Sequence, residues 1–175
     1  MESGSRRRLA SLSMSRSVDV TVGARAAASV EVAFDTIAPI DLASIFERWL
    51  LIPGVSGVRD QSGPWDAPGR TRTVRLSDGS EAPERLTAVN RPHDFAYSVG
   101  PFPRPLGLLA SSAEGDWSFV PAPGGGSEVR WTYRFTARPG RRVLVRALIA
   151  PMWRGYAQRA LDRAVAAAEA GGPTT

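Results

Sequence analysis

Two charged residues, Arg72 and Glu84, stand in an otherwise apolar pattern and are the first candidates for chemistry. Both fall on the face of a predicted β-hairpin that also carries Val74 and Leu86. Burying either charge alone is costly, so we expect the two side chains to form a pair. The pair is either a structural ion pair at the sheet edge or an anchor for a ligand carboxylate, carbonyl or hydroxyl. In an apolar cavity Glu84 would have a raised pKa, as a general acid or base requires.

Aromatic side chains are predicted to point inward from neighbouring strands and from the helix that packs on them: Phe95, Tyr97, Trp117, Phe119, Trp131, Tyr133, Phe135, Trp153 and Tyr156. They form either an ordinary packed core or the wall of a cavity for a hydrophobic or aromatic ligand. The polar tips of buried Tyr and Trp need partners, which a ligand or water in a pocket supplies. We assign no catalytic residue and predict that the ligand is bound by Arg72, Glu84, Tyr97, Trp117, Trp131, Tyr133, Trp153 and Tyr156.

The composition excludes several kinds of site. The 175 residues include no Cys, no Lys and one His, so disulfides, Cys/His zinc sites, Schiff-base lysines and P-loop lysines are ruled out. The single His93 lies in a predicted turn and is expected at the surface. Gly124, Gly125 and Gly126 lie between two strands, where no dinucleotide loop can form. We therefore predict no metal and no cofactor.

The positive charge lies at the two ends of the chain. The net charge is +5 overall, but +3 for residues 1–28, −2 for 29–140 and +4 for 141–175. Without a basic stripe in the body, we predict no nucleic-acid partner. Arg141, Arg142 and Arg146 are expected to be solvated, or to contact an anionic membrane or ligand weakly. No run reaches the ~18 apolar residues of a membrane helix, so we expect a cytoplasmic monomer or homodimer without an integral membrane segment.

These side chains must be positioned by a sheet and a helix. Residues 1–28 are predicted to be a flexible basic tail, in which either Met1 or Met14 is the true start. Residues 29–35 alternate as a strand, with Val30, Val32 and Phe34 on one face. Pro39 and Asp41 then begin a helix that carries Leu42, Ile45, Phe46 and Trp49 at helical spacing and ends at Pro53.

Most of the remaining chain alternates as strands. They are predicted over 55–59 (or a turn of helix there), 70–76, 81–90, 95–99, 114–121 and 129–136, with a broken apolar loop over 101–109. From Arg141 to Ala170 the period becomes helical, and Pro151 kinks this helix or begins a second one. A block of strands followed by a long helix predicts an α+β fold, with residues 29–170 as one domain and 171–175 as a tail.

The hairpin over 70–90 has two plausible registers. A two-residue turn places Leu86 on the face opposite Leu76. A three-residue loop pairs Ser77 with Glu81 and collects Arg72, Val74, Leu76, Ala82, Glu84, Leu86 and Ala88 on one face, with Arg72 and Glu84 diagonal to one another. The second register keeps the apolar residues together and is preferred.

Local phrases in this order resemble the START-like, Bet v 1-like (SRPBCC) superfamily, and its polyketide cyclase/dehydrase and lipid-transport group in particular. The resemblance covers about residues 29–170 and is carried by Ala38-Pro39-Ile40-Asp41, Ile52-Pro53-Gly54-Val55, Gly63 to Arg72, Leu76-Ser77-Asp78-Gly79, Glu84, Trp131-Thr132-Tyr133 and the closing helix. It implies a helix-grip fold, in which a seven-stranded antiparallel sheet wraps around the C-terminal helix and encloses an apolar cavity. Such a fold does not fix the chemistry.

Three functions remain open. The first is a carrier or sequestering protein for a lipid, an isoprenoid or a polyketide-like aromatic compound. The second is a cofactor-free cyclase, aromatase or dehydratase that uses Glu84, Arg72 and a cavity Tyr. The third is an interaction module with a filled core that docks through the Pro-rich loop, for which we expect an exposed apolar patch and no cavity.

Overall fold

One antiparallel sheet of seven strands forms the body of the protein in a computed structural model that describes residues 16–171. Its spatial order is β1-β7-β6-β5-β4-β3-β2, so consecutive strands are neighbours except where β1 lies beside β7. The strands are β1 (Ser17–Ala26), β2 (Val55–Arg59), β3 (Thr71–Leu76), β4 (Glu81–Asn90), β5 (Asp94–Val99), β6 (Ala110–Pro121) and β7 (Ser127–Ala137).

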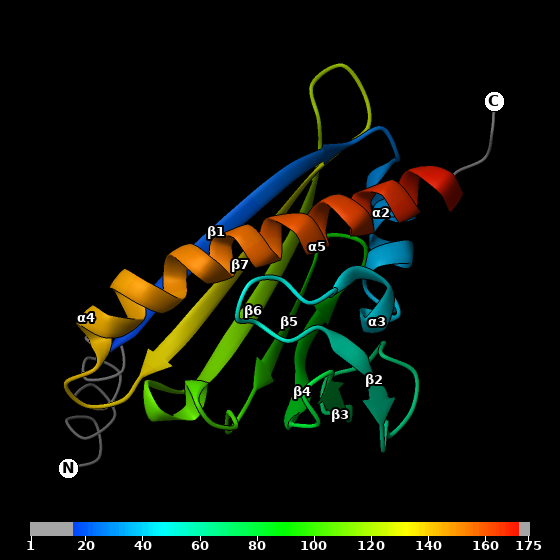
Figure 1. Cartoon of the computed structure of the whole chain (residues 1–175). Helices are drawn as coiled ribbons and strands as arrows, with labels where there is room; N and C mark the ends of the chain where they lie inside the picture. The colour runs from blue at the N-terminus through cyan, green and yellow to red at the C-terminus, as the bar shows by residue number, and fades with distance from the viewer. Residues whose placement is uncertain (1–15, 172–175) are drawn as a thin grey trace, which may run out of the picture.

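The long C-terminal helix α5 (Ala150–Gly171) crosses one face of this sheet (Figure 1). It continues from α4 (Arg142–Leu144) and the π-helix η2 (Val145–Ile149), so a change of helix type precedes Pro151. Two short helices, α2 (Val30–Ile37) and α3 (Leu42–Ile45), follow β1, and the 3-10 helix η1 (Leu106–Leu108) precedes β6. This is the predicted α+β helix-grip architecture.

The prediction of a tail over 1–28 is wrong for residues 17–26, which form the edge strand β1. Val18, Val20 and Val22 point into the core, and β1 pairs with β7 along its whole length. The Arg- and Ser-rich composition of residues 1–28 favoured a tail over the strand that this alternation indicates. The expectations for the start of the chain, including Met14, concern residues 1–15 and lie outside the described residues. At the other end Gly171 still belongs to α5, and residues 172–175 lie outside the described part.

The segment predicted as the first strand is the helix α2. Ser29 caps it by accepting a hydrogen bond from the Val32 backbone amide, and Val30, Ala33, Phe34 and Ile37 form its buried face. Val30 and Phe34 are four residues apart, so they fit a helix as well as a strand. The Ser29 cap favours the helix. The next helix, α3, begins after the Asp41 cap as predicted but ends at Ile45, far short of Pro53.

The hairpin β3–β4 has the predicted faces but a register shifted by two residues. Arg72 lies directly opposite Glu84, not diagonal to it, and Val74 lies opposite Ala82. An even shift leaves every side chain on its predicted face. Ala88 is an exception and is exposed, because the β4–β5 register shifts between Leu86 and Ala88.

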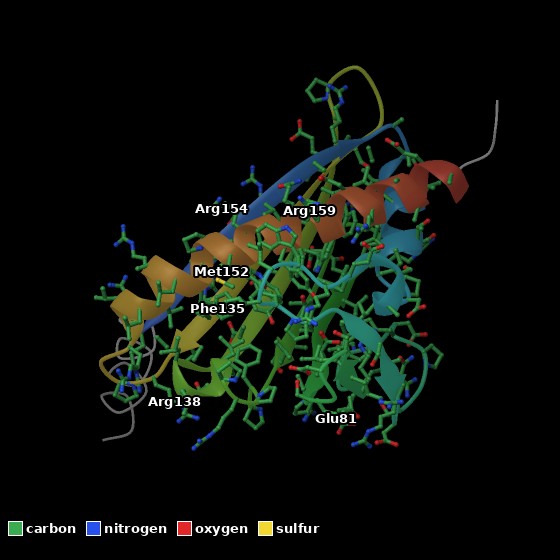
Figure 2. The ribbon with its side chains drawn as sticks, in the orientation of Figure 1. Glu81, Phe135, Arg138, Met152, Arg154 and Arg159 are labelled. Carbon is green, nitrogen blue, oxygen red and sulfur yellow. The ribbon has the colours of Figure 1, made fainter. Side chains whose placement is uncertain are left out.

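The core fills the space between the sheet, α5 and α2. Phe119, Trp131 and Phe135 on the sheet and Leu161 on α5 are almost completely buried. Figure 2 shows Phe135 and Met152 in the region where β7 and α5 face each other. Within residues 16–171, no helix is both long enough and apolar enough to span a membrane.

Candidate functional site

A cavity of about 180 Å³ lies between the inner face of the sheet, α5 and the loops at one end of the sheet. Its walls are mainly apolar and include segments from α2 and α3, from β3 to β7 and from the loop over 102–106. All eight residues predicted to bind a ligand line it: Arg72, Glu84, Tyr97, Trp117, Trp131, Tyr133, Trp153 and Tyr156. The structure therefore brings the predicted set together around one space.

The aromatic wall of the cavity follows from strand register. Trp117 lies opposite Trp131, and their rings stack with centroids 4.7 Å apart. Gly115 lies between Tyr97 and Tyr133 in the register of the three strands. A Cβ atom at Gly115 would lie 2.3 Å from the Tyr97 ring, so this position must lack a side chain for the ring to cross β6. Phe119 and Phe135 belong to the same face but pack into the core beyond the cavity.

Helix α5 closes the cavity with Trp153 and Tyr156. The Trp153 ring lies 4.3 Å from the Tyr133 ring, centroid to centroid. The Tyr156 hydroxyl donates to the Pro53 carbonyl at 2.9 Å and so ties α5 to the loop before β2. Gly155 lies against the Trp49 ring, which would be 2.3 Å from a Cβ at that position. The segment from Phe46 to Pro53 is thereby held against α5 as one wall of the cavity.

The polar corner of the cavity consists of Arg72, Glu84 and Trp65. The Arg72 and Glu84 side chains are each only 7% exposed, and Arg72 Nε donates to Glu84 Oε2 at 2.5 Å. The Trp65 ring covers the guanidinium group, whose Cζ lies 3.9 Å from the ring centroid. The face and one edge of the guanidinium are thus fixed by the protein.

The rest of the guanidinium is free to bind a ligand. Among residues 16–171, neither terminal nitrogen of Arg72 has a hydrogen-bond partner. Arg carries five N–H donors in a fixed plane, and Glu84 uses the one on Nε. The open donors lie in the cavity wall, where a carbonyl, carboxylate or phenol oxygen would satisfy them.

The protonation states of the cavity groups are set by burial. Burial raises the pKa of the Glu84 carboxyl above its ordinary value, although the neighbouring Arg72 charge opposes the shift. Burial also raises the pKa values of the Tyr97 and Tyr133 phenols, and the negative charge of Glu84 adds to the shift in Tyr97. The phenols are therefore neutral at pH 7 and act as hydrogen-bond donors or acceptors.

Several residues outside the predicted set also form the site. Trp65, in the loop before β3, is buried and lines the cavity. Phe102 and Leu106 of the predicted loop line it too, whereas Leu108 is half exposed. Phe46 was placed on a helix stripe and sits instead at the end of α3, facing the cavity. No local sequence pattern indicates that the loop over 101–109 turns toward the cavity.

The remaining candidates do not converge on the cavity. His93 is exposed in the turn between β4 and β5, as predicted. Within the described part of the chain, no group of three or more His, Cys, Asp or Glu residues could hold a metal. Arg141, Arg142 and Arg146 are exposed at the start of the C-terminal helical segment, where Arg142 Nε donates to the Ser17 carbonyl.

Comparison with protein families decides the affiliation. The family model described as "Polyketide cyclase / dehydrase and lipid transport" matches residues 17–169. The chain belongs to this family. The match begins at β1, seventeen residues into the chain, which agrees with the structure and not with the predicted boundary at residue 29.

Solved structures of the same fold include two di-domain ARO/CYC proteins from biosynthetic pathways. The di-domain ARO/CYC BexL from the BE-7585A biosynthetic pathway has a TM-score of 0.65 and 19% identity over 98% of this chain and 59% of its own. The di-domain ARO/CYC StfQ from the steffimycin biosynthetic pathway has a TM-score of 0.68 and 18% identity, over 92% of this chain and 53% of its own. The chain thus spans a little over half of either di-domain protein.

A third structure, Ara h 8.0201, has a TM-score of 0.61 and 13% identity over 88% of this chain and 96% of its own. A protein from Nitrosospira multiformis has a TM-score of 0.63 and 16% identity, over 85% of this chain and 94% of its own. These likenesses show the Bet v 1-like fold. No curated protein sequence matches the chain.

Proposed function

We propose that the protein binds a hydrophobic small molecule in the cavity and acts as its carrier or sequestering protein. The observation that carries this proposal is the cavity of about 180 Å³, whose wall is largely apolar and aromatic and whose corner at Arg72 and Glu84 has unused donors. Two further findings support it: the family includes lipid-transport proteins by its description, and the sheet and α5 leave this space unfilled.

The size and chemistry of the cavity favour a compact ligand that contains a ring. A dry apolar cavity of about 150 Å³ holds benzene, whereas drug-sized ligands occupy about 300–1,000 Å³. The cavity therefore suits one or two rings, or a short isoprenoid or acyl segment. Since the open donors of Arg72 lie at one corner, we expect an acceptor oxygen at one end of the ligand.

The second candidate function is a cofactor-free cyclase, aromatase or dehydratase. It is favoured by the convergence of Glu84, Arg72 and Tyr97 on one cavity, together with the raised pKa of Glu84. The Glu84 carboxylate would remove the proton next to a substrate carbonyl, and Arg72 would stabilise the enolate oxygen that results. The protonated Glu84 would then return that proton to the leaving hydroxyl, which departs as water. The third candidate, an interaction module with a filled core, is disfavoured because it required that no such cavity exist.

Calorimetry with a ligand panel tests the proposal. The panel contains tetralones, naphthols, short isoprenoid alcohols and medium-chain fatty acids. The expected result is saturable binding by the wild type, loss of binding in Leu76→Trp, which fills the cavity from its lining, and retention in Arg75→Trp, whose side chain is exposed on the same strand. Binding that survives Leu76→Trp, or no binding by any member, contradicts the proposal.

Turnover separates the two leading functions. Each ligand that binds is incubated with wild type and with Glu84→Gln, and the products are followed by chromatography. A carrier returns every ligand unchanged. A product that wild type forms and Glu84→Gln does not form supports the enzyme.

A further inference from the structure

An exposed pair of leucines lies at the tip of the turn that leads into the cavity wall. Leu50 is 63% exposed and Leu51 is 85% exposed, between Trp49 and Ile52, which bridge to each other. Leu50 also has a φ of +51°, a left-handed conformation that a branched side chain disfavours. Hydration of two leucines and backbone strain both cost free energy, and no contact with the described residues 16–171 offsets them.

The turn lies against a helical segment that also exposes apolar side chains. Trp49 packs on Gly155 of α5, and Leu148, Met152 and Gly155 follow one another at helical spacing along one face. Leu148 is 54% exposed and Val143 is 75% exposed. Two turns of helix separate Leu148 from Gly155, which is about 10 Å. The Trp49 contact thus places the turn on the side of the helix that carries Leu148.

The same helical segment carries only positive charge. No Asp or Glu occurs from Val129 to Leu161, whereas Arg141, Arg142, Arg146, Arg154 and Arg159 lie along the helix. Figure 2 shows Arg154 and Arg159 on α5, above Met152. Arg146 and Arg154 lie in the groove beside β1, on the other side of the helix from Leu148. The arginines beside the turn are Arg48, which precedes Trp49 in the chain, and Arg159, whose Cζ lies 5.5 Å from the Trp49 ring centroid. Among the described residues, neither Arg48 nor Arg159 forms an ion pair. Apolar side chains beside unpaired arginines are typical of a surface that lies on an anionic bilayer.

We propose that this surface, made of Leu50, Leu51, Leu148, Arg48 and Arg159, docks on an anionic lipid bilayer. The proposal rests on the proposed function, to which it adds the source of the ligand: Ile52 and Pro53, next to the inserted leucines, line the cavity. A second copy of the chain fits less well, because its arginines would repel those of the first. Bilayer contact at this turn places the cavity wall beside the lipid from which a hydrophobic ligand would come.

Sedimentation with vesicles tests the docking. Wild type is mixed with vesicles of phosphatidylcholine alone and of equal parts phosphatidylcholine and phosphatidylglycerol. We expect binding to the anionic vesicles that weakens with added salt, and little binding to the neutral ones. Leu50→Ser/Leu51→Ser should lower the partition coefficient at least tenfold. Arg48→Ser/Arg159→Ser should lower it about 30-fold.

Two matched variants serve as controls. Val120→Ser/Val58→Ser removes exposed apolar residues elsewhere, and Arg75→Ser/Arg85→Ser removes exposed arginines from β3 and β4. Both should bind like wild type apart from a small loss from net charge. The proposal is overturned if wild type ignores anionic vesicles, if test and control variants lose equal affinity, or if the leucine variant changes the oligomeric state instead.

Ligand affinity in solution separates this proposal from the proposed function. Leu50 and Leu51 do not line the cavity, so Leu50→Ser/Leu51→Ser should keep the calorimetric affinity of any ligand that wild type binds. Loss of vesicle binding with intact ligand affinity supports the docking. Intact ligand affinity in a wild type that binds no vesicles overturns the docking alone and leaves the proposed function standing.

Discussion

The aromatic wall and the polar corner of the cavity are built in different ways. The wall comes from regular alternation on β5, β6 and β7, where strand register places Tyr97, Trp117, Trp131 and Tyr133 side by side. The corner depends on three segments that meet only in the fold: Arg72 on β3, Glu84 on β4 and Trp65 in the loop before β3. The wall is therefore redundant and tolerant of single changes, whereas each member of the corner depends on the other two.

The largest effect is expected when the corner loses one charge. Glu84→Leu leaves Arg72 buried without its partner, and we expect a loss of about 3–5 kcal/mol in the free energy of unfolding. Arg72→Leu/Glu84→Leu should recover most of this loss because no unpaired charge remains. Urea unfolding measures both.

The exposed pair of Arg59 and Glu81 provides the control for that comparison. Arg59→Leu should cost less than about 1 kcal/mol, because an ion pair in contact with water contributes little. Equal losses in Glu84→Leu and Arg59→Leu would contradict the account of the corner as a dependent unit.

A smaller effect is expected when the aromatic wall is crowded at Gly115. Gly115→Ala places a methyl group against the Tyr97 ring, and we expect a destabilisation of about 1–3 kcal/mol with a changed near-ultraviolet circular dichroism spectrum. Gly23→Ala on β1 is the matched change, since its Cβ would make only an ordinary contact 3.6 Å from the Val129 carbonyl. A Gly115→Ala protein as stable as Gly23→Ala would contradict the proposed packing of Tyr97.

The smallest effect concerns pH and again sets the corner apart from the wall. The pKa of Glu84 is raised in the folded protein, so the folded state holds this proton more tightly than the unfolded chain does. The contribution of Glu84 to stability is therefore fully present below the ordinary pKa of about 4.5 and is lost as the pH rises through the folded value.

The comparison of wild type with Glu84→Gln isolates this contribution, because other carboxyl groups titrate alike in both. Relative to the variant, wild type should lose stability between about pH 4.5 and the higher folded pKa in urea titrations at a series of pH values. A difference that stays constant, or that grows in favour of wild type as the pH rises, would show that the pKa of Glu84 is not raised in the folded protein.

The sequence predicts the aromatic wall better than the polar corner, because the wall comes from alternation within single strands and the corner from contacts between separate segments. Alternating Val129, Trp131, Tyr133 and Phe135 specify a face whatever the neighbouring strands do. In the hairpin, a side chain changes face only when the register shifts by an odd number of residues. The predicted register differs from the observed one by two residues, so it still places Arg72 and Glu84 on one face. The stacking of Trp65 on Arg72 is a contact between a loop and a strand, and no local periodicity encodes it.

The errors at the N-terminal end arose from composition and from short apolar runs. Val18, Val20 and Val22 alternate as clearly as any strand, but Arg-rich residues around them favoured a tail. Val30, Val32 and Phe34 satisfied a strand pattern, whereas the Ser29 cap and the spacing of Val30, Ala33 and Phe34 indicated the helix that forms. A short apolar run can therefore be assigned to a helix or a strand only when the capping residue before it is considered as well.

Mass spectrometry of an organic extract of the purified protein tests the central claim, that wall and corner enclose one ligand site, most directly. Trp131→Ala/Tyr133→Ala removes two rings of the wall and is extracted in parallel. We predict a small molecule near one equivalent in the wild-type extract and its absence from the variant. An empty wild-type extract, together with no thermal shift by lipids or aromatic polyketides, would contradict the claim.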